Sequence, residues 1–380
     1  SLVLLVGAGL ALRTFLALIK TDPGFNPDNL LTMNLLLPAA KYTDEPKRAA
    51  FYNDLIQRMK STPGVESAAA VSHLPLGGSN ASDAYLVEGE VEPPRDQENL
   101  ARYRVCTPDY FQTMKIPVVK GRSFTDQDKQ GGPPVVIINE AFARRFLNGA
   151  NPVGRGFWIE ASPGEPDTRY EIVGMVRNTK YGDLREEFRP IVYYAASQDD
   201  SGTGGKFMIR SRLTETETVA AVKRTLNEIN PAITVDFKGF KPLIEATILR
   251  ERLMATLSGF FGVLALVLAC IGLYGILSYG VASRTNEIGI RMALGAGRRD
   301  VFWLILREAF LLVIAGVAVG LPIIFAVTRL ASALLFGLTP TDPVSLLLAA
   351  LLMLAVAMVA GYLPSRRATR VDPLVALRSE

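Results

Sequence analysis

The sequence predicts a multi-pass α-helical membrane protein with four transmembrane helices, the first truncated, and a large α+β extracytoplasmic domain. Three long uncharged runs, at residues 253–282, 309–328 and 344–363, can each cross a hydrocarbon core of roughly 30 Å. About 230 residues rich in charge, proline and glycine separate the first apolar segment from these runs, which is enough chain for one or two folded domains. The composition, 49% apolar and 21% charged, averages these two kinds of segment.

The first apolar segment is shorter than the others. Its run ends near Leu12, and Arg13 and Lys20 follow it. We expect residues 1–20 to hold a truncated transmembrane helix. The alternative is a cleaved signal peptide, but this would have its basic residues before the apolar run and a small-residue cleavage site after it.

The basic residues indicate which side of the membrane each link occupies. The link 283–300 and the tail after the last run each contain four arginines, whereas residues 336–343 contain neither lysine nor arginine. By the positive-inside rule the first two face the cytoplasm, so residues 21–250 lie outside. The net charge of +4 is explained by this topology and requires no nucleic acid, since no basic cluster is interleaved with aromatics.

The outside region contains a weak internal repeat of strand, helix and strand. Apolar or periodic segments predict the first unit as strand 30–37, helix 46–60 and strand 65–71, and the second unit as strand 206–210, helix 216–229 and strand 233–237. Two such units can share one sheet with both helices on one face, the split βαβ arrangement of ferredoxin-like folds. We expect this assembly next to the membrane.

Residues from about 75 to 198 then form an insertion, a mixed α/β subdomain. We expect its strands at 134–138, 170–176 and 191–194, with Asn139 capping a short helix that ends at Phe146. After the second unit, residues 242–252 are expected to form a polar helix that runs directly into the second span and links its motion to that of the domain.

We expect the remaining transmembrane helices at about 253–282, 305–330 and 344–364. The first of these is roughly 45 Å long, so part of it should project as a stalk. Gly316 and Gly320 are four residues apart; this spacing allows close helix packing or simply reflects the composition of membrane helices. No span has Asp, Glu or Lys at its centre, although channels for hydrophilic solutes usually need such a group. Force transmission or a lipophilic substrate is therefore favoured.

The inside link predicts a short helix at 286–296. Glu287 precedes Arg291 by one turn, the order that favours an ion pair, and Gly295 with Gly297 ends the helix. The sequence leaves open whether this helix lies at the lipid interface or contacts a protein.

Groups for catalysis are scarce. The nearest candidate for a phosphate-binding loop, residues 202–206, is followed by Phe207 rather than Ser or Thr. The single histidine, His73, is expected to make a loop hydrogen bond. The acid pairs Asp126 with Asp128 and Glu186 with Glu187 are expected in solvated loops or helix starts. We therefore expect no catalytic residue, no cofactor, no metal site and no enzymatic activity in this chain.

Several segments resemble one known family. The segment Glu287-Ile288-Gly289-Ile290-Arg291-Met292-Ala293-Leu294-Gly295-Ala296 resembles the inside motif of the FtsX/MacB-like ABC transporter permeases, and residues 373–378 resemble their C-terminus. Residues 121–124, 134–140 and 170–174 are similar to the MacB-type periplasmic core domain. Among these permeases the chain resembles one half of a duplicated orphan permease.

The resemblance implies a MacB-like periplasmic core at 21–250 and an FtsX-like permease domain at 251–380, in a bacterial inner membrane. It also implies a separate cytoplasmic ABC ATPase and a second permease unit, either a homodimer partner or the other half of a duplicated chain. The residues expected to contact the ATPase are Glu287, Ile288, Gly289, Arg291, Met292, Leu294 and Gly295.

Two functions follow from this resemblance. One is a relay of ATP-driven motion that exports or extracts an amphiphile, peptide or lipoprotein, with a periplasmic adaptor as a further partner. The other is a relay that regulates an envelope enzyme or sensor and transports nothing, for which a bound periplasmic hydrolase would be the evidence. A membrane-anchored enzyme is a third alternative, without a cluster of residues to support it.

Overall fold

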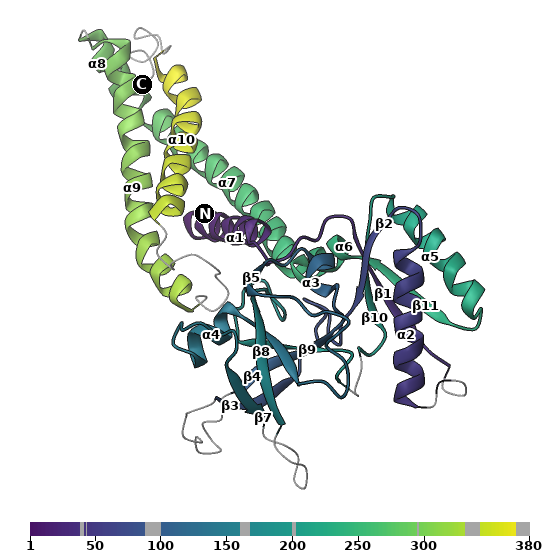
Figure 1. Cartoon of the computed structure of the whole chain (residues 1–380). Coiled ribbons are helices and arrows are strands. Elements are labelled where there is room, and N and C mark those ends of the chain that lie inside the picture. The colour runs from purple at the N-terminus through teal and green to yellow at the C-terminus, as the bar shows by residue number, and fades with distance from the viewer. Residues whose placement is uncertain are drawn as a thin grey trace. The chain divides into compact units, whose positions relative to one another are not determined.

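The computed structural model divides the chain into two compact units. One unit is residues 21–247, and the other combines residues 1–20 with residues 248–380 (Figure 1). The predicted outside turn at 336–343 falls almost entirely outside the described residues, and the C-terminal motif at 373–378 does so completely. The structure describes residues 1–38, 42, 44–87, 100–159, 168–199, 203–294, 296–330 and 343–369.

The two predicted strand–helix–strand segments share one antiparallel sheet. Its strands, in the order β11-β1-β10-β2, are β11 (Thr234–Gly239), β1 (Leu30–Leu36), β10 (Lys206–Ser211) and β2 (Val65–Ala70). Strands from the first segment alternate with strands from the second. The sheet therefore requires both segments, although about 135 residues separate them along the chain.

Helices α2 (Glu45–Lys60) and α5 (Glu215–Ile229) pack their apolar residues against this sheet. Leu55 and Met59 of α2 and Val222 and Leu226 of α5 belong to one buried cluster with the sheet residues. Both helices begin at a side-chain cap that satisfies free backbone N–H groups. The Thr214 cap of α5 forms a reciprocal capping box with Glu217.

Arg210 ties the four-stranded sheet to the segments around it. Its side chain is only 3% exposed and lies on the central strand β10. Nε donates to the carbonyl of Thr113 at 2.7 Å, Nη2 donates to that of Asn26 at 2.7 Å, and Nη1 donates to that of Asp28. One buried guanidinium thus satisfies three backbone acceptors on two separate segments.

The insertion forms a second, seven-stranded sheet in the order β5-β8-β6-β9-β4-β3-β7. Strand β7 pairs with both β3 and β8, so six of the strands close into a barrel. Strand β5 pairs with the last residues of β8, on the edge that β7 uses at the start of β8. Closure removes the open edges that a sheet would otherwise expose. The strands are β3 (Ser82–Val87), β4 (Leu100–Cys106), β5 (Val118–Gly121), β6 (Val135–Asn139), β7 (Gly156–Ile159), β8 (Thr168–Val176) and β9 (Ile191–Ala195).

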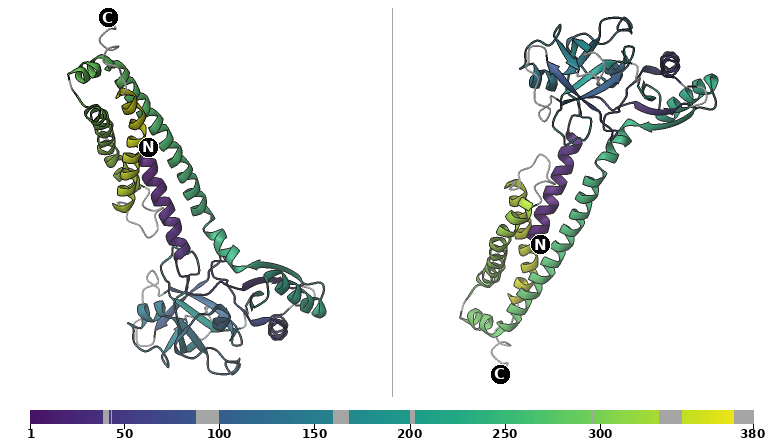
Figure 2. Two further views of the ribbon diagram at one scale, coloured as in Figure 1. Left: turned by 90° about the horizontal axis from the view of Figure 1, so that it is seen from above. Right: turned by 90° about the horizontal axis from the view of Figure 1, so that it is seen from below.

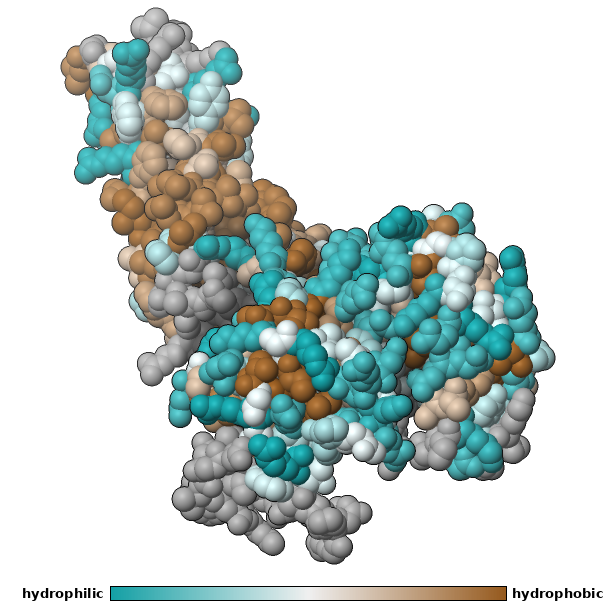
Figure 3. All heavy atoms as spheres, viewed as in Figure 1, coloured by the Kyte–Doolittle hydropathy of each residue, from teal (hydrophilic) through white to brown (hydrophobic). Residues whose placement is uncertain are grey.

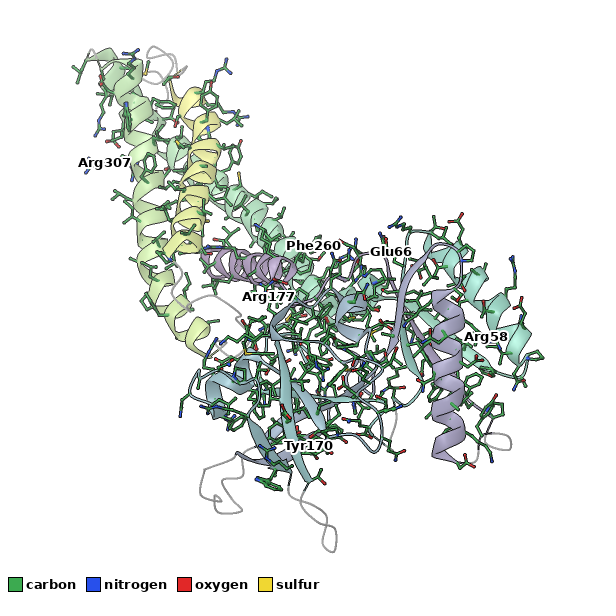
Figure 4. The ribbon with its side chains drawn as sticks, in the orientation of Figure 1. Arg58, Glu66, Tyr170, Arg177, Phe260 and Arg307 are labelled. Atoms are coloured by element: carbon green, nitrogen blue, oxygen red, sulfur yellow. The ribbon has the colours of Figure 1, made fainter. Side chains whose placement is uncertain are left out.

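Two short helices accompany the barrel, α3 (Tyr110–Met114) and α4 (Glu140–Phe146). Asn139 caps α4, because its Oδ1 accepts the N–H of Phe142 at 2.9 Å, as the sequence predicted. Phe142 and Phe146 of α4 join the apolar core of the strands. Tyr170 of β8, labelled in Figure 4, packs against the same core.

The other unit is helical. Four of its described helices are long and apolar enough to cross a membrane, in agreement with the four predicted spans. The helix at the N-terminus packs along α7, as both views of Figure 2 show. A broad hydrophobic surface covers these helices in Figure 3. Many of their large apolar side chains are mostly exposed, Phe260 and Val319 among them. The helices are α1 (Leu2–Lys20), α7 (Leu249–Ser283), α8 (Thr285–Ala293), α9 (Arg298–Leu330) and α10 (Pro343–Ala368).

The two glycines of the predicted packing motif differ in their surroundings. A Cβ on Gly320 would approach Leu2 of α1 to 2.9 Å, whereas a Cβ on Gly316 would meet no atom within 4 Å. Gly262 of α7 lies similarly close to Ala8, at 3.2 Å. Close packing of α1 therefore uses one small residue from α9 and one from α7, rather than the glycine pair.

The predicted continuous helix from residue 242 into the second span is wrong. Helix α6 (Phe240–Thr247) ends before α7 begins, and Ile248 between them has φ −104° and ψ 6°, outside the helical region. The Thr247 hydroxyl donates to the carbonyl of Ile244 at 2.7 Å, a local bond that competes with helix continuation. Ile248 therefore separates α6 from α7. We call residues 21–247 the outer unit, after the location that the sequence predicts for them.

Candidate coupling site

Helix α8 has an inward face that holds it against the other helices. Ile288 is 4% exposed and belongs to a buried cluster with Leu277 of α7 and Ile305 of α9. Met292, one turn later, packs on the same cluster, and Gly289 beside Ile288 is also buried. Displacement of α8 would therefore be transmitted to α7 and α9 through packed side chains.

The opposite face of α8 is exposed and combines an ion pair with apolar side chains. Arg291 Nη2 lies 2.6 Å from Glu287 Oε1 across one helical turn. Ile290 is 47% exposed and Leu294, just after the helix, is 82% exposed. Positions 287, 290, 291 and 294 follow the spacing of one helical face; we call these four residues the α8 outer face.

The structure thus divides the seven residues predicted to contact an ATPase. Glu287, Arg291 and Leu294 belong to the α8 outer face, whereas Ile288, Gly289 and Met292 pack inward. Gly295 lies outside the described residues. Ile290 was not among the seven predicted residues, although its spacing from Glu287 and Leu294 places it on the same exposed face.

Ion pairs and caps brace the helices on either side of α8. Arg284, at the junction of α7 and α8, forms an ion pair with Glu308 of α9. The Asp300 side chain accepts the N–H of Gly297 at 2.9 Å, which caps the start of α9. Arg307, next to Glu308, instead projects from α9 away from α10 (Figure 4). These contacts hold the base of α8, so its position is set by the bundle.

The acid pairs of the outer unit correct two of the sequence predictions. Asp128 was expected to be solvated, but it is buried and forms a two-pronged ion pair with Arg122, with both N–O distances at 2.7 Å. Arg122 holds the pKa of Asp128 below its usual value. Glu186 likewise accepts the N–H groups of Tyr181 and Gly182 at 2.7 and 2.8 Å. Both carboxylates thus accept backbone N–H groups and pair with an arginine, Asp128 while buried and Glu186 while half-buried, so their roles are structural.

His73 lies in a partly buried, basic environment. Its Nδ1 is 3.0 Å from the Ser72 hydroxyl, in line with the expected loop hydrogen bond. Burial, together with the charges of Arg104 and Lys206, lowers the pKa of His73 to about 4. Across the described ranges, no three His, Cys, Asp or Glu side chains gather as metal ligands.

We expect His73 to make folding stability depend on pH. Its pKa in the folded state lies below the ordinary value of 6.5, so the unfolded chain takes up this proton first as pH falls. The stabilisation is complete above about pH 6.5 and is lost as pH falls toward 4. After allowance for solvent screening, the loss should be about 1 kcal/mol.

The chain has one histidine, so its imidazole NMR signal is unambiguous in the full chain. Titration with ¹³C-labelled histidine should give a midpoint near 4, and His73→Gln should flatten the fall in unfolding free energy below pH 6.5. A midpoint near 6.5 would contradict the buried environment.

Two family models match the chain. The MacB-like periplasmic core domain matches residues 1–229, and the FtsX-like permease C-terminal domain matches residues 259–373. The first match alone covers more than half of the chain.

Curated relatives agree with these matches. A pyoverdine export ATP-binding/permease protein, PvdT of Pseudomonas aeruginosa, is 26% identical over 72% of this chain and 41% of its own length. A macrolide export ATP-binding/permease protein, MacB of an Azoarcus species, is 26% identical over 72% of this chain and 42% of its own length. The chain spans about two fifths of the length of these relatives.

Among solved structures, the periplasmic region of MacB from Actinobacillus actinomycetemcomitans covers 60% of this chain and 97% of its own length. Its sequence identity is 11% and its TM-score 0.41, too low to define the fold. The two family models, which together cover most of the sequence, are decisive: the chain belongs to the FtsX-like permeases with a MacB-like periplasmic core domain.

Proposed function

We propose that this chain is the membrane subunit of an ABC-type machine that relays ATP-driven motion to its outer domain in order to export or extract an amphiphile, peptide or lipoprotein. The α8 outer face is the observation that carries the proposal. An exposed ion pair flanked by two exposed apolar side chains suits a protein contact, while the inward face of the same helix packs on α7 and α9.

The ATPase would be a separate cytoplasmic partner. The relatives' names combine ATP-binding and permease parts, and this chain has about two fifths of their length. Its sequence contains no phosphate-binding loop. ATP hydrolysis is therefore assigned to another polypeptide or to another part of a longer one.

The relay would run from α8 through α7 to the outer unit. Helix α7 has 35 residues, about 52 Å at 1.5 Å per residue, so it is longer than a membrane requires. The break between α6 and α7 at Ile248 would be the point at which the motion passes to the outer unit. Membrane spans without a central acid or lysine suit such a mechanical role better than a path for hydrophilic solutes.

The proposed location, the lipid contacts and the fold class of the outer sheet follow from charge distribution, exposed apolar faces and strand order. The arginines near α8 favour a cytoplasmic location for this helix, and parity then puts the outer unit in the periplasm of a bacterial inner membrane. The exposed apolar faces of α7, α9 and α10 would contact lipid and a second permease unit. The strand order β11-β1-β10-β2 supports a ferredoxin-like class for the antiparallel sheet.

Co-purification tests the proposal. The protein is isolated from its native membrane in mild detergent, and bound proteins are identified by mass spectrometry and assayed for ATP hydrolysis. Recovery of an ABC ATPase at stoichiometric level is the expected result. If no ATPase is recovered, the assignment to an ABC machine is wrong and a membrane scaffold is the better account.

A second assay separates transport from regulation. The complex is reconstituted in proteoliposomes with a fluorescent lipopeptide in the leaflet that faces the outer unit, and release is followed after ATP addition. We expect ATP-dependent release. Recovery of a bound periplasmic hydrolase whose activity responds to ATP, without release of lipopeptide, would instead identify a regulatory relay.

A further inference from the structure

A basic pocket opens on the surface of the barrel subdomain. Its volume is about 640 Å³, within the range of pockets that hold small molecules. It lies between α4 and the segment that leads into β9. Its lining is Ser82, Leu100, Ala101, Arg102, Ala141, Arg144, Arg145, Glu187, Phe188, Arg189 and Pro190.

The charges around this pocket are unbalanced. Arg102 is neutralised by Glu186, with an N–O distance of 2.9 Å. Arg144, Arg145 and Arg189 form no ion pair within the described part of the chain, and Glu187 is the sole carboxylate of the lining. Three guanidinium groups around one cavity repel one another, so an anionic occupant would be stabilised there.

The pocket is held in place by a buried residue. Asn139 accepts the N–H of Phe142 in α4 and that of Ile191 in β9, both at 2.9 Å, and its amide donates to the carbonyl of Arg189 at 2.8 Å. Asn139 is fully buried. The two arginines of α4 and Arg189 therefore sit on backbone segments joined by one rigid hub, which reduces the entropy lost on ligand binding.

One wall of the pocket is apolar. Phe188 and Leu100 are 43% and 52% exposed, and both line the pocket. Lys180 lies over the Phe188 ring, 4.3 Å from its centroid, which fixes the ring's orientation. An occupant of this pocket would thus need an apolar part next to its anionic group.

We propose that this pocket binds acidic amphiphiles, with the phosphate or carboxylate group held by Arg144, Arg145 and Arg189 and the apolar part against Phe188 and Leu100. Paired N–H donors of arginine match the two oxygens of such groups. This binding site would extend the proposed function. The proposal rests on that function only in treating the bound amphiphile as the exported cargo. Binding itself requires no ATPase, so failure of binding and failure of the relay give separate results.

Calorimetric titration of the full chain in phosphatidylcholine nanodiscs tests the proposal, with empty nanodiscs as the blank. The probes are octyl phosphate, inorganic phosphate and octyltrimethylammonium. We expect octyl phosphate to bind at least about tenfold more tightly than inorganic phosphate, and the cation to give no heat above the blank. Equal binding of the two phosphates, or binding of the cation, would overturn the proposal.

Two triple variants provide the matched comparison. Arg144→Gln/Arg145→Gln/Arg189→Gln should weaken octyl phosphate binding by about 100-fold. Arg58→Gln/Arg212→Gln/Arg224→Gln removes the same charge from the other sheet region and should leave binding unchanged. Phe188→Ser should weaken binding of octyl phosphate but not of inorganic phosphate. Equal loss in both triple variants would mean that only net charge matters, and the pocket would be excluded.

A titration in nanodiscs of a different lipid identifies the natural source of the anion. If phosphatidylglycerol nanodiscs abolish octyl phosphate binding to the wild-type chain, the pocket accepts membrane head groups. If binding persists there, the pocket prefers free acidic amphiphiles. Either result supports binding of an acidic amphiphile in this pocket. Wild-type affinity for octyl phosphate in the Arg144/Arg145/Arg189 variant would contradict it.

Discussion

Leu294→Asp is expected to remove the ATPase from the purified complex while the permease itself stays folded. Leu294 is 82% exposed at the end of α8, so its replacement disturbs no internal packing. A buried interface contact replaced by a charge typically weakens binding by 2 kcal/mol or more, about 30-fold. The measurement is the ratio of ATPase to permease after affinity purification, together with the ATP hydrolysis rate.

Two control variants are needed to interpret the loss of ATPase. Leu36→Asp changes a leucine of the outer unit that is 66% exposed, and it should leave the ATPase bound. Ile288→Asp puts a charge into the inward cluster of α8 and should lower the yield of folded permease. If Leu294→Asp retains the ATPase at the wild-type ratio, α8 lies against lipid rather than against a partner.

The Glu287–Arg291 pair permits a charge-swap experiment. Glu287→Ala/Arg291→Ala is expected to weaken ATPase binding, but loss of helix stability and loss of contact would look alike. The swapped variant, Glu287→Arg/Arg291→Glu, keeps an ion pair on the helix. Such a pair contributes only about 0.3–0.5 kcal/mol to helix stability. If ATPase binding is still weak in the swapped variant, the two charges contact the partner. If ATPase binding recovers fully, the charges only stabilise α8.

Arg210→Ala is expected to destabilise the outer unit strongly. Its loss would leave the carbonyls of Asn26, Asp28 and Thr113 without their donor and open a cavity beside β10. Buried unsatisfied groups cost about 1–3 kcal/mol each, partly recovered by water entry. We expect the free energy of unfolding to fall by roughly 3–5 kcal/mol.

Arg212→Ala is the matched control, two residues further along the chain. Its side chain is 81% exposed and pairs with Glu66, so its removal should cost about 1 kcal/mol or less. Hydrogen exchange of the β1 and β10 amides in the full-length chain measures both variants under native conditions. Similar losses in the two variants would mean that the three carbonyl contacts contribute little.

The sequence was sufficient to predict the elements whose formation depends only on neighbouring residues. Three long uncharged runs and one shorter apolar segment predicted the four membrane helices, because the hydrocarbon core favours such segments. The cap at Asn139 was visible for the same reason, since an N-cap needs only the residues that follow it. The motif at 287–296 and the segments of the outer domain together predicted the permease family, which the family models confirmed.

Strands with mixed or exposed faces escaped detection. β4 contains two arginines, and all four residues of β5 are exposed, so neither shows a hydrophobic period. β3 and β7 were also missed, and it is β7 that closes the barrel by pairing with β3 and β8. Pairing between strands so far apart in sequence depends on register across the whole sheet.

The sequence by itself determined where this chain can cross a membrane, where the two strand–helix–strand segments lie and which short helix follows the second span. Only the tertiary structure decided which face of that helix is exposed, that Asp128 is buried against Arg122, and that α6 ends before α7 begins. The physical reason is range: helix formation and hydrophobic length are set by neighbouring residues. Burial and hydrogen-bond partners are set by residues that folding brings together from elsewhere in the chain.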